Sequence, residues 1–108
     1  MQEIMRPAES SVIVLRNMVD VEGIDDELEV DLRSECEKFG IVNQITVYQE
    51  RQSEDDDAEI IVKIFVKFRL PSEACRARDA LNGRMYAERI IQAELYDQML
   101  YEANDLSG

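Results

Sequence analysis

The chain alternates between short runs of β-branched and aromatic residues and longer stretches in which apolar residues recur every three or four positions. The short runs predict strands, and they occupy residues 11–17, 42–50, 59–68 and 89–96. The longer stretches, at residues 23–40 and 71–81, predict helices. The order β-α-β-β-α-β favours two right-handed β-α-β units. We therefore expect an α+β sandwich with a four-stranded antiparallel sheet and both helices on one face.

The two predicted helices each have one apolar side. In the first helix, the apolar stripe consists of Leu28, Leu32, Cys36 and Phe39. In the second helix, which starts at Pro71 with Ser72, the apolar side consists of Ala74, Ala77 and Leu81. Asp25 or Asp26 is suited to cap the first helix, and Gly40 is expected to end it in a left-handed conformation.

The segments outside this pattern are polar or irregular. Residues 1–10 predict a flexible N-terminal arm, residues 51–58 predict a polar loop, and Asn82-Gly83 predicts a turn. The domain itself is expected over residues 11–97, followed by a C-terminal extension over 98–108. This extension could form one or two helical turns, and Tyr96, Met99 and Leu100 could then fold over the open face of the sheet.

Composition narrows the range of functions. The chain has 108 residues, which is enough for one domain with its own core, and a formal net charge of −12. This charge opposes a polyanion and favours a basic ligand. We expect no membrane span, because no apolar run approaches ~20 residues. We expect no signal peptide, because residues 1–10 are acidic as well as basic and lack an apolar core. Cys36 and Cys75 are expected to be reduced, and with no His in the chain we expect no metal site and no cofactor.

The predicted third strand can be compared with the signature of RNA-recognition motifs, K/R-G-F/Y-G/A-F-V-x-F/Y. Such domains stack bases on aromatic side chains of the sheet. Residues 61–68 align with this signature and fit its second half, but in the first half Val62 stands in place of the Gly and Lys63 in place of the first aromatic residue. In the first strand, Val14 stands at another stacking position, so only Phe65 remains of three. Each lost platform forfeits about 1–3 kcal/mol. Phe65 and Lys63 remain candidates for residual RNA contact, but tight RNA binding by the sheet is not expected.

The first predicted helix is strongly acidic. Glu27, Asp31 and Glu35 are spaced four apart and form a stripe of like charges, in which each pair destabilises the helix by roughly 0.2–0.5 kcal/mol. The helix dipole favours carboxylates in the first turn, but Asp31 and Glu35 lie too late to benefit. Two interpretations stay open: a solvated acidic face, or a docking face for a Lys/Arg-rich peptide.

The segment Arg84-Met85-Tyr86 follows the predicted Asn82-Gly83 turn. An aromatic side chain in a loop beside a strand more often serves packing than function. Beside an acidic helix, however, an exposed ring and a guanidinium could clamp a flat apolar side chain. Trp would suit this clamp best, because its cation–π attraction to Arg is the greatest and its ring buries the most area.

These features together resemble a known family, the U2-auxiliary-factor homology motif (UHM), an RNA-recognition-motif-like domain that binds peptides. The supporting stretches are VIVLRNMV, SECEKFG, KIFVKF and LNGRMYAER, and the resemblance covers about residues 11–97. Within the family, the chain looks most similar to the C-terminal domain of poly(U)-binding splicing factors of the half-pint type. The stretches NMVDVEGIDDELE, DAEIIVKIFVKF and AELYDQ carry that similarity, together with NDLS near the C-terminus.

The resemblance implies a nuclear, non-enzymatic module of pre-mRNA splicing. Its ligands would be short, disordered basic segments around one Trp, known as UHM-ligand motifs. The implied partners are the large branch-site recognition subunit, the branch-point-binding protein and the large U2 auxiliary factor subunit.

The resemblance also implies the roles of particular residues. The family's Arg-x-Phe motif falls on Arg84-Met85-Tyr86. By this correspondence Tyr86 would stack on the ligand Trp, while Arg84 would lie beside the indole and pair with Glu35. The acidic side chains that would meet the basic residues of the ligand are Asp25, Glu27, Asp31 and Glu35. Tyr86 is a departure, since the family usually has Phe there, and this leaves the ligand spectrum open.

Two alternatives to this reading remain. The chain could be a degenerate RNA-recognition motif that binds single-stranded RNA weakly, or a homodimerisation module in which the acidic helix receives a basic loop of a second copy. An enzyme is a poor fit, because the sequence contains no His, no G-x-S-x-G motif and no phosphate-cradling glycine loop.

Overall fold

The structure, a computed structural model, describes residues 10–19, 21–51, 60–86 and 88–106. Its strands are β1 (Val12–Arg16), β2 (Val42–Arg51), β3 (Ile60–Phe68), β4 (Met85–Tyr86), β5 (Arg89–Ile90) and β6 (Gln92–Tyr96). Its helices are the 3-10 turn η2 (Val21–Gly23), α1 (Asp26–Cys36), α2 (Pro71–Leu81) and α3 (Gln98–Glu102). The N-terminal arm predicted over residues 1–10 and the loop predicted over 51–58 fall almost wholly outside the described residues.

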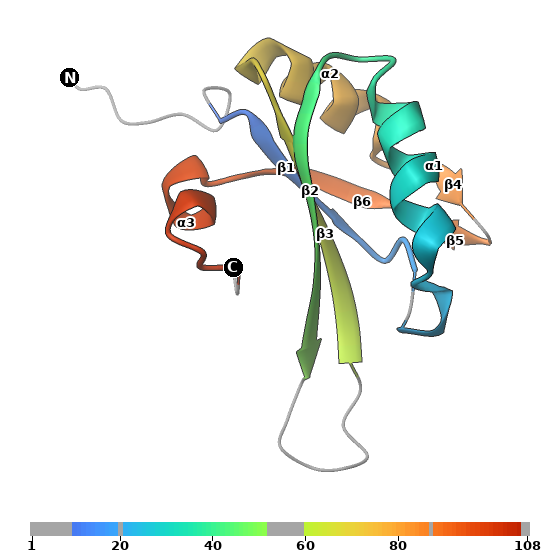
Figure 1. Cartoon of the computed structure of the whole chain (residues 1–108). Coiled ribbons are helices and arrows are strands. Elements are labelled where there is room, and N and C mark those ends of the chain that lie inside the picture. Colours follow the sequence, from blue (N-terminus) through green and yellow to red (C-terminus); the bar gives the residue numbers. More distant parts are fainter. Residues whose placement is uncertain (1–9, 20, 52–59, 87, 107–108) are drawn as a thin grey trace.

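Four strands form one antiparallel sheet in the order β2-β3-β1-β6, so that β1 and β3 lie in the centre. Helices α1 and α2 cover one face of this sheet, and the short α3 lies on the other side (Figure 1). The predicted RNA-recognition-motif-like α+β fold is therefore confirmed.

The larger core lies between the sheet and its two long helices. The buried residues that α1 and α2 contribute are Leu28, Leu32, Cys36, Ala74, Ala77 and Leu81. They pack against alternate residues of the central strands, such as Ile13 and Leu15 of β1, because successive strand side chains point to opposite faces. The predicted apolar side of α2 is thus confirmed, and so is that of α1 for Leu28, Leu32 and Cys36. Phe39, predicted as part of the same helical stripe, lies beyond the end of α1 and is only partly buried against this core. Burial raises the pKa of the Cys36 thiol to about 12, and the neighbouring Glu35 and Glu37 add to the effect.

The predicted cap at the N-terminus of α1 is confirmed, but the prediction for its C-terminus is wrong. At the N-terminus Asp25 is the cap, since its Oδ1 accepts hydrogen bonds from the amides of Glu27 (3.1 Å) and Leu28 (2.9 Å). At the C-terminus the expectation for Gly40 is wrong, because among the described glycines only Gly83 has a positive φ. Gly40 serves close packing instead: a Cβ at this position would collide with the side chain of Glu73 on α2.

The opposite face of the sheet carries a second, smaller core. Its buried residues are Val12, Val14, Phe65, Tyr96, Tyr101 and Leu106. The ring of Phe65 lies edge-on to Tyr96, with 4.8 Å between the ring centroids, and 5.9 Å from Tyr101. The C-terminal segment thus folds over the sheet. Of the residues expected to cover the sheet, Tyr96 is buried, but the expectation was wrong for Met99 and Leu100, which are exposed, and Tyr101 and Leu106 are buried in their place.

Polar contacts fix this C-terminal segment to the sheet. The Tyr101 hydroxyl lies 3.0 Å from Oγ1 of Thr46, and Lys67 forms an ion pair with Glu102 at 3.1 Å. Ser10, which the sequence analysis placed in the N-terminal arm, is buried, and its hydroxyl donates to the carbonyl of Tyr96. The folded unit therefore includes residues on both sides of the predicted 11–97 range.

Candidate functional site

The candidate site begins with a small hairpin that the sequence analysis did not foresee. The strand predicted over residues 89–96 is divided: β6 joins the sheet from Gln92, whereas β5 pairs with β4 in a separate hairpin. The division falls at Ile91, whose amide donates to the Arg84 carbonyl and whose carbonyl accepts from the Gly83 amide, both at 2.8 Å. These bonds close the turn before β4 and direct the hairpin away from the sheet.

The turn itself requires its two predicted residues. Gly83 has a φ of 88°, which disfavours any side chain with a Cβ. The side-chain Oδ1 of Asn82 accepts a hydrogen bond from the Ala93 amide at 3.0 Å and so connects the turn to β6. Asn82-Gly83 therefore sets the position from which Arg84 projects.

A second connection to the hairpin comes from Asn17, at the end of β1. Its Nδ2 donates to the Ile90 carbonyl (2.9 Å), and its Oδ1 accepts from Nη1 of Arg89 (3.0 Å). Asn17 has a φ of 64°, a conformation that Asn tolerates better than most residues. The sequence analysis missed this role, although an Asn directly after a buried strand was an available signal.

The hairpin and the acidic helix meet through one ion pair. Nη1 of Arg84 lies 2.5 Å from Oε2 of Glu35, and Lys38 contacts the other oxygen of the same carboxylate at 3.4 Å. Partial burial acts to raise the pKa of Glu35, but Arg84 and Lys38 outweigh it, so the net pKa is lowered. Glu35 is therefore a charged anchor that places Arg84 over the last turns of α1.

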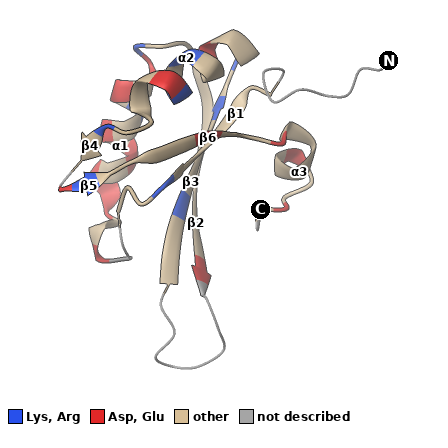
Figure 2. Cartoon of the chain, turned by 180° about the vertical axis from the view of Figure 1, so that it is seen from behind, with Lys and Arg blue, Asp and Glu red and all other residues tan. Residues whose placement is uncertain are grey.

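The remaining acidic residues of the stripe face solvent. Glu27 and Asp31 are exposed on α1, and the red colour of acidic residues marks much of the ribbon of this helix in Figure 2. Asp25 is also exposed, but one of its oxygens is engaged in capping the helix. Arg33 lies 3.9 Å from both Glu29 and Glu37 and leaves the charge of Glu27 and Asp31 unaffected. This helix surface can attract a basic segment.

The apolar residues of the hairpin divide between the core and the surface. Tyr86 is partly buried and packs against the larger core. Met85 and its cross-strand partner Ile90 are 63% and 52% exposed, an unusual pair of large apolar side chains at the surface. Ile90 was absent from the predicted site. The two consecutive isoleucines were a signal for it, since Ile91 is buried and its neighbour on the hairpin has to face outward.

The two residues proposed for residual RNA contact are covered. Phe65 has 0% of its surface exposed, because Tyr96 and Tyr101 pack on it, so it cannot stack on a base in this structure. Lys63 is 5% exposed, and its Nζ lies 2.8 Å from Oε1 of Glu50. The position of Phe65 on the sheet is therefore covered by the C-terminal segment.

Among the residues that the structure describes, no three His, Cys, Asp or Glu side chains gather into a group that could hold a metal ion. None of the helices in the described ranges is long and apolar enough to span a bilayer.

Comparison with known proteins identifies close relatives in sequence. The chain is 55% identical to the poly(U)-binding-splicing factor PUF60 of Homo sapiens and 50% identical to the poly(U)-binding-splicing factor hfp of Drosophila melanogaster, in each case over the whole chain. It is 35% identical over 98 residues to splicing factor 45 of Homo sapiens. The chain spans 19%, 17% and 24% of these three proteins, respectively. No protein-family model matches it.

Solved structures agree with the fold. The RNA-recognition motif of RNA15 superposes with a TM-score of 0.61 at 22% identity, covering 93% of this chain and 99% of that one. The third RNA-recognition motif of Mip6 gives a TM-score of 0.59 at 16% identity, covering 81% of this chain and 93% of that one. At such identities the likeness extends to the fold alone.

Proposed function

We propose that this chain, which belongs to the poly(U)-binding splicing factor family, is a non-enzymatic protein-interaction module of pre-mRNA splicing that binds short basic peptides containing one Trp. Its relatives are poly(U)-binding splicing factors and splicing factor 45, which confirms the resemblance to splicing factors of this family drawn from the sequence. The peptide ligand, the partner proteins and the nuclear location belong to the proposal.

The observation that carries the proposal is the ion pair between Arg84 and Glu35. These residues lie 49 positions apart, in the loop and the helix that the sequence analysis selected on separate grounds. Their contact brings the guanidinium and the partly buried ring of Tyr86 to the end of the acidic helix. The cation and the aromatic ring are suited to hold the indole of a Trp, and the carboxylates are suited to pair with basic residues on either side of it.

The ligand would use these parts in different ways. The indole would lie against Tyr86 with Arg84 beside it, since such a cation–π contact contributes ~0.5–2 kcal/mol. The basic residues of the ligand would follow Asp31 and Glu27 along the exposed side of α1, with Asp25 at its start. Met85 and Ile90 would extend the apolar contact, so the proposed site includes one residue that the sequence analysis had not selected.

Calorimetric titration with a Lys/Arg-rich peptide containing one Trp tests the proposal. We expect micromolar or tighter binding that is lost when the Trp is replaced by Ala. Tyr86→Ala should weaken binding by at least ~2 kcal/mol if its ring is the hot spot, whereas Tyr86→Phe, which keeps the ring, should bind at least as well as the original.

The matched control is Tyr48→Ala, which removes the same side chain from the opposite face of the sheet, where Tyr48 packs against the smaller core. Peptide affinity should be unchanged in this variant. Equal losses in Tyr86→Ala and Tyr48→Ala would point to general destabilisation, and an unchanged affinity in Tyr86→Ala would overturn the proposed mode of binding.

Weak binding of single-stranded RNA is the second candidate, supported by the description of the relatives as poly(U)-binding. The burial of Phe65 opposes it. Titration with oligo(U) separates the two: RNA binding by the original chain that disappears in Lys63→Ala or Phe65→Ala, with no response to the peptide, would favour the RNA-binding reading. Homodimerisation by the acidic helix would appear as a mass that depends on concentration in light scattering.

A further inference from the structure

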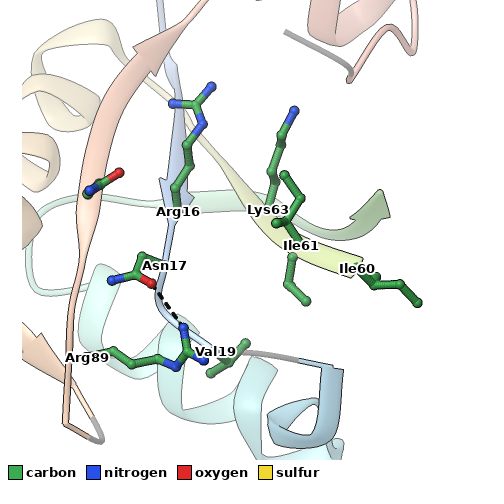
Figure 3. A pocket seen from close by; sticks show the side chains of 9 residues that line it. Arg16, Asn17, Val19, Ile60, Ile61, Lys63 and Arg89 are labelled. Atoms are coloured by element: carbon green, nitrogen blue, oxygen red, sulfur yellow. Dashed lines mark hydrogen bonds between the residues drawn. The ribbon is translucent and has the colours of Figure 1, made fainter. Parts of the chain in front are cut away.

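A cavity of about 270 Å³ opens on the sheet face that α3 covers only in part, at the end of β1 away from that helix. Its polar lining includes three cationic side chains: Arg16 from β1, Lys63 from β3 and Arg89 from β5. Its apolar wall includes Val19, Ile60 and Ile61. Figure 3 shows Arg16 and Lys63 projecting side by side, with Arg89 held by Asn17 at the lower edge.

This gathering of cations is unusual in the chain, which has twice as many acidic as basic residues, 24 against 12. Arg16 and Lys63 are direct cross-strand partners, an arrangement in which like charges destabilise a sheet. Each is compensated by a carboxylate: Arg16 pairs with Glu94 at 2.5 Å and Lys63 with Glu50 at 2.8 Å. An added anion would therefore compete with carboxylates already in place.

We infer that this cavity is a separate docking site for a phosphoserine flanked by aliphatic residues in a partner peptide. A phosphoserine carries a charge of about −1.5 to −2 at pH 7 and three acceptor oxygens. It would therefore displace Glu94 from Arg16 more effectively than a single carboxylate of the partner could. The aliphatic wall would receive the side chains next to the phosphoserine, and the planar guanidinium of Arg16 is suited to a bidentate contact with phosphate.

The composition of the cavity favours a peptide over a nucleic acid. Among the described residues that line it there is no aromatic ring, and sequence-tolerant binding of single strands depends on stacking against such rings. The neighbouring ring of Phe65 is buried. A long polyanion would also meet the net charge of the chain, whereas a phosphoserine presents a single charged group to the three cations of the cavity.

Calorimetry with two synthetic peptides on the whole chain tests this inference. The first has an Ile-phosphoserine-Ile centre between Gly and Ser residues, and the second is the same peptide without phosphate. We expect the phosphorylated peptide to bind at least about tenfold more tightly, because hydrogen bonds to charged groups are the strong ones. Arg16→Gln should remove most of this difference, and Glu94→Gln, which removes the competing carboxylate, should increase it.

The matched control is Arg76→Gln, which makes the same change of charge at an exposed position on α2. It should leave the affinity for the phosphorylated peptide within about twofold, as expected for a remote surface charge. The increase expected in Glu94→Gln cannot arise from loss of folding. The Trp-containing peptide should bind Arg16→Gln as tightly as the original chain. Failure of the phosphopeptide to bind would therefore leave the proposed function intact, and failure of the Trp-containing peptide to bind would leave this inference intact.

Three results would overturn the inference. The two peptides could bind equally, Arg76→Gln could weaken binding as much as Arg16→Gln does, or inorganic phosphate could bind as tightly as the phosphopeptide. A fourth result, displacement of the phosphopeptide by oligo(U) in a manner that depends on Arg16, would assign the cavity to nucleic acid instead.

Discussion

The two faces of the sheet are covered in different ways. The face under α1 and α2 carries seventeen buried residues in one continuous apolar cluster. The face under α3 has six, and the rest of its cover consists of polar contacts and ion pairs, such as those of Tyr101 with Thr46 and of Lys67 with Glu102. Because the first face has the larger apolar core, we expect it to contribute most of the stability of the fold, and we expect the segment that covers the second face to open separately.

The largest expected difference between the faces concerns their cores. Leu32→Ala removes a nearly fully buried side chain under α1 and should lower the free energy of unfolding by about 2–5 kcal/mol. The same substitution at Leu106 should have a smaller effect, because that residue lies at the edge of the second core. Urea unfolding measures both. Equal losses in the two variants would mean that α3 is part of one cooperative core.

Helices α1 and α3, on opposite faces of the sheet, are both capped at their N-termini by an aspartate. Asp25 accepts hydrogen bonds from two amides at the start of α1, and Asp97 does the same at the start of α3. Loss of such a cap costs about 0.5–2 kcal/mol. Asp25→Ala should lower the stability of the whole domain by this amount. Asp97→Ala should leave it nearly unchanged and speed amide hydrogen exchange around Phe65, and a drop in global stability in both variants would contradict separate opening.

The smallest expected effect lies in the acid titration of Glu35. A carboxyl group whose pKa is lower in the folded state contributes stability above its ordinary value of 4.5, and this contribution disappears as the pH falls below that value. Because Glu35 and Arg84 are 28% and 48% exposed, the pair should contribute only ~0.2–1 kcal/mol. Glu35→Gln should therefore be slightly less stable at pH 7 and equal to the original chain near pH 2, as measured by urea unfolding.

Much of the fold follows from the sequence, because periodicity reports directly on burial. The stripe from Leu28 to Cys36 specifies one buried side of α1, and it is confirmed. The apolar run over residues 59–68 predicts a strand, and β3 is that strand, buried on both faces over Val62–Val66. Gly40 shows the limit of this reasoning. A glycine after a helix indicates a left-handed cap, but here the glycine makes room for Glu73 of α2, a neighbour that no local pattern reveals.

The same limit applies to the site and to the second face. Arg84 and Glu35 were predicted as partners, through the family resemblance, and they do form an ion pair. Ile90 and Asn17 were missed, because their roles depend on where β5 leaves the path of β6. The C-terminal segment was predicted to fold over the sheet face that carries Phe65, but the sequence does not state which of its residues turn inward, and Tyr101 is buried there instead of Met99.

The two side-chain hydrogen bonds of Asn17, to Ile90 and Arg89, restrict which residues can replace it. Ala would lose both side-chain hydrogen bonds and would be strained at a φ of 64°. Gly would relieve the backbone but would still hold neither Ile90 nor Arg89. Asp would keep the acceptor for Arg89 and lose the donor to Ile90. No other natural amino acid therefore supplies the donor, the acceptor and the tolerated backbone together with so short a side chain, which makes Asn17 the least replaceable polar residue of the hairpin's support.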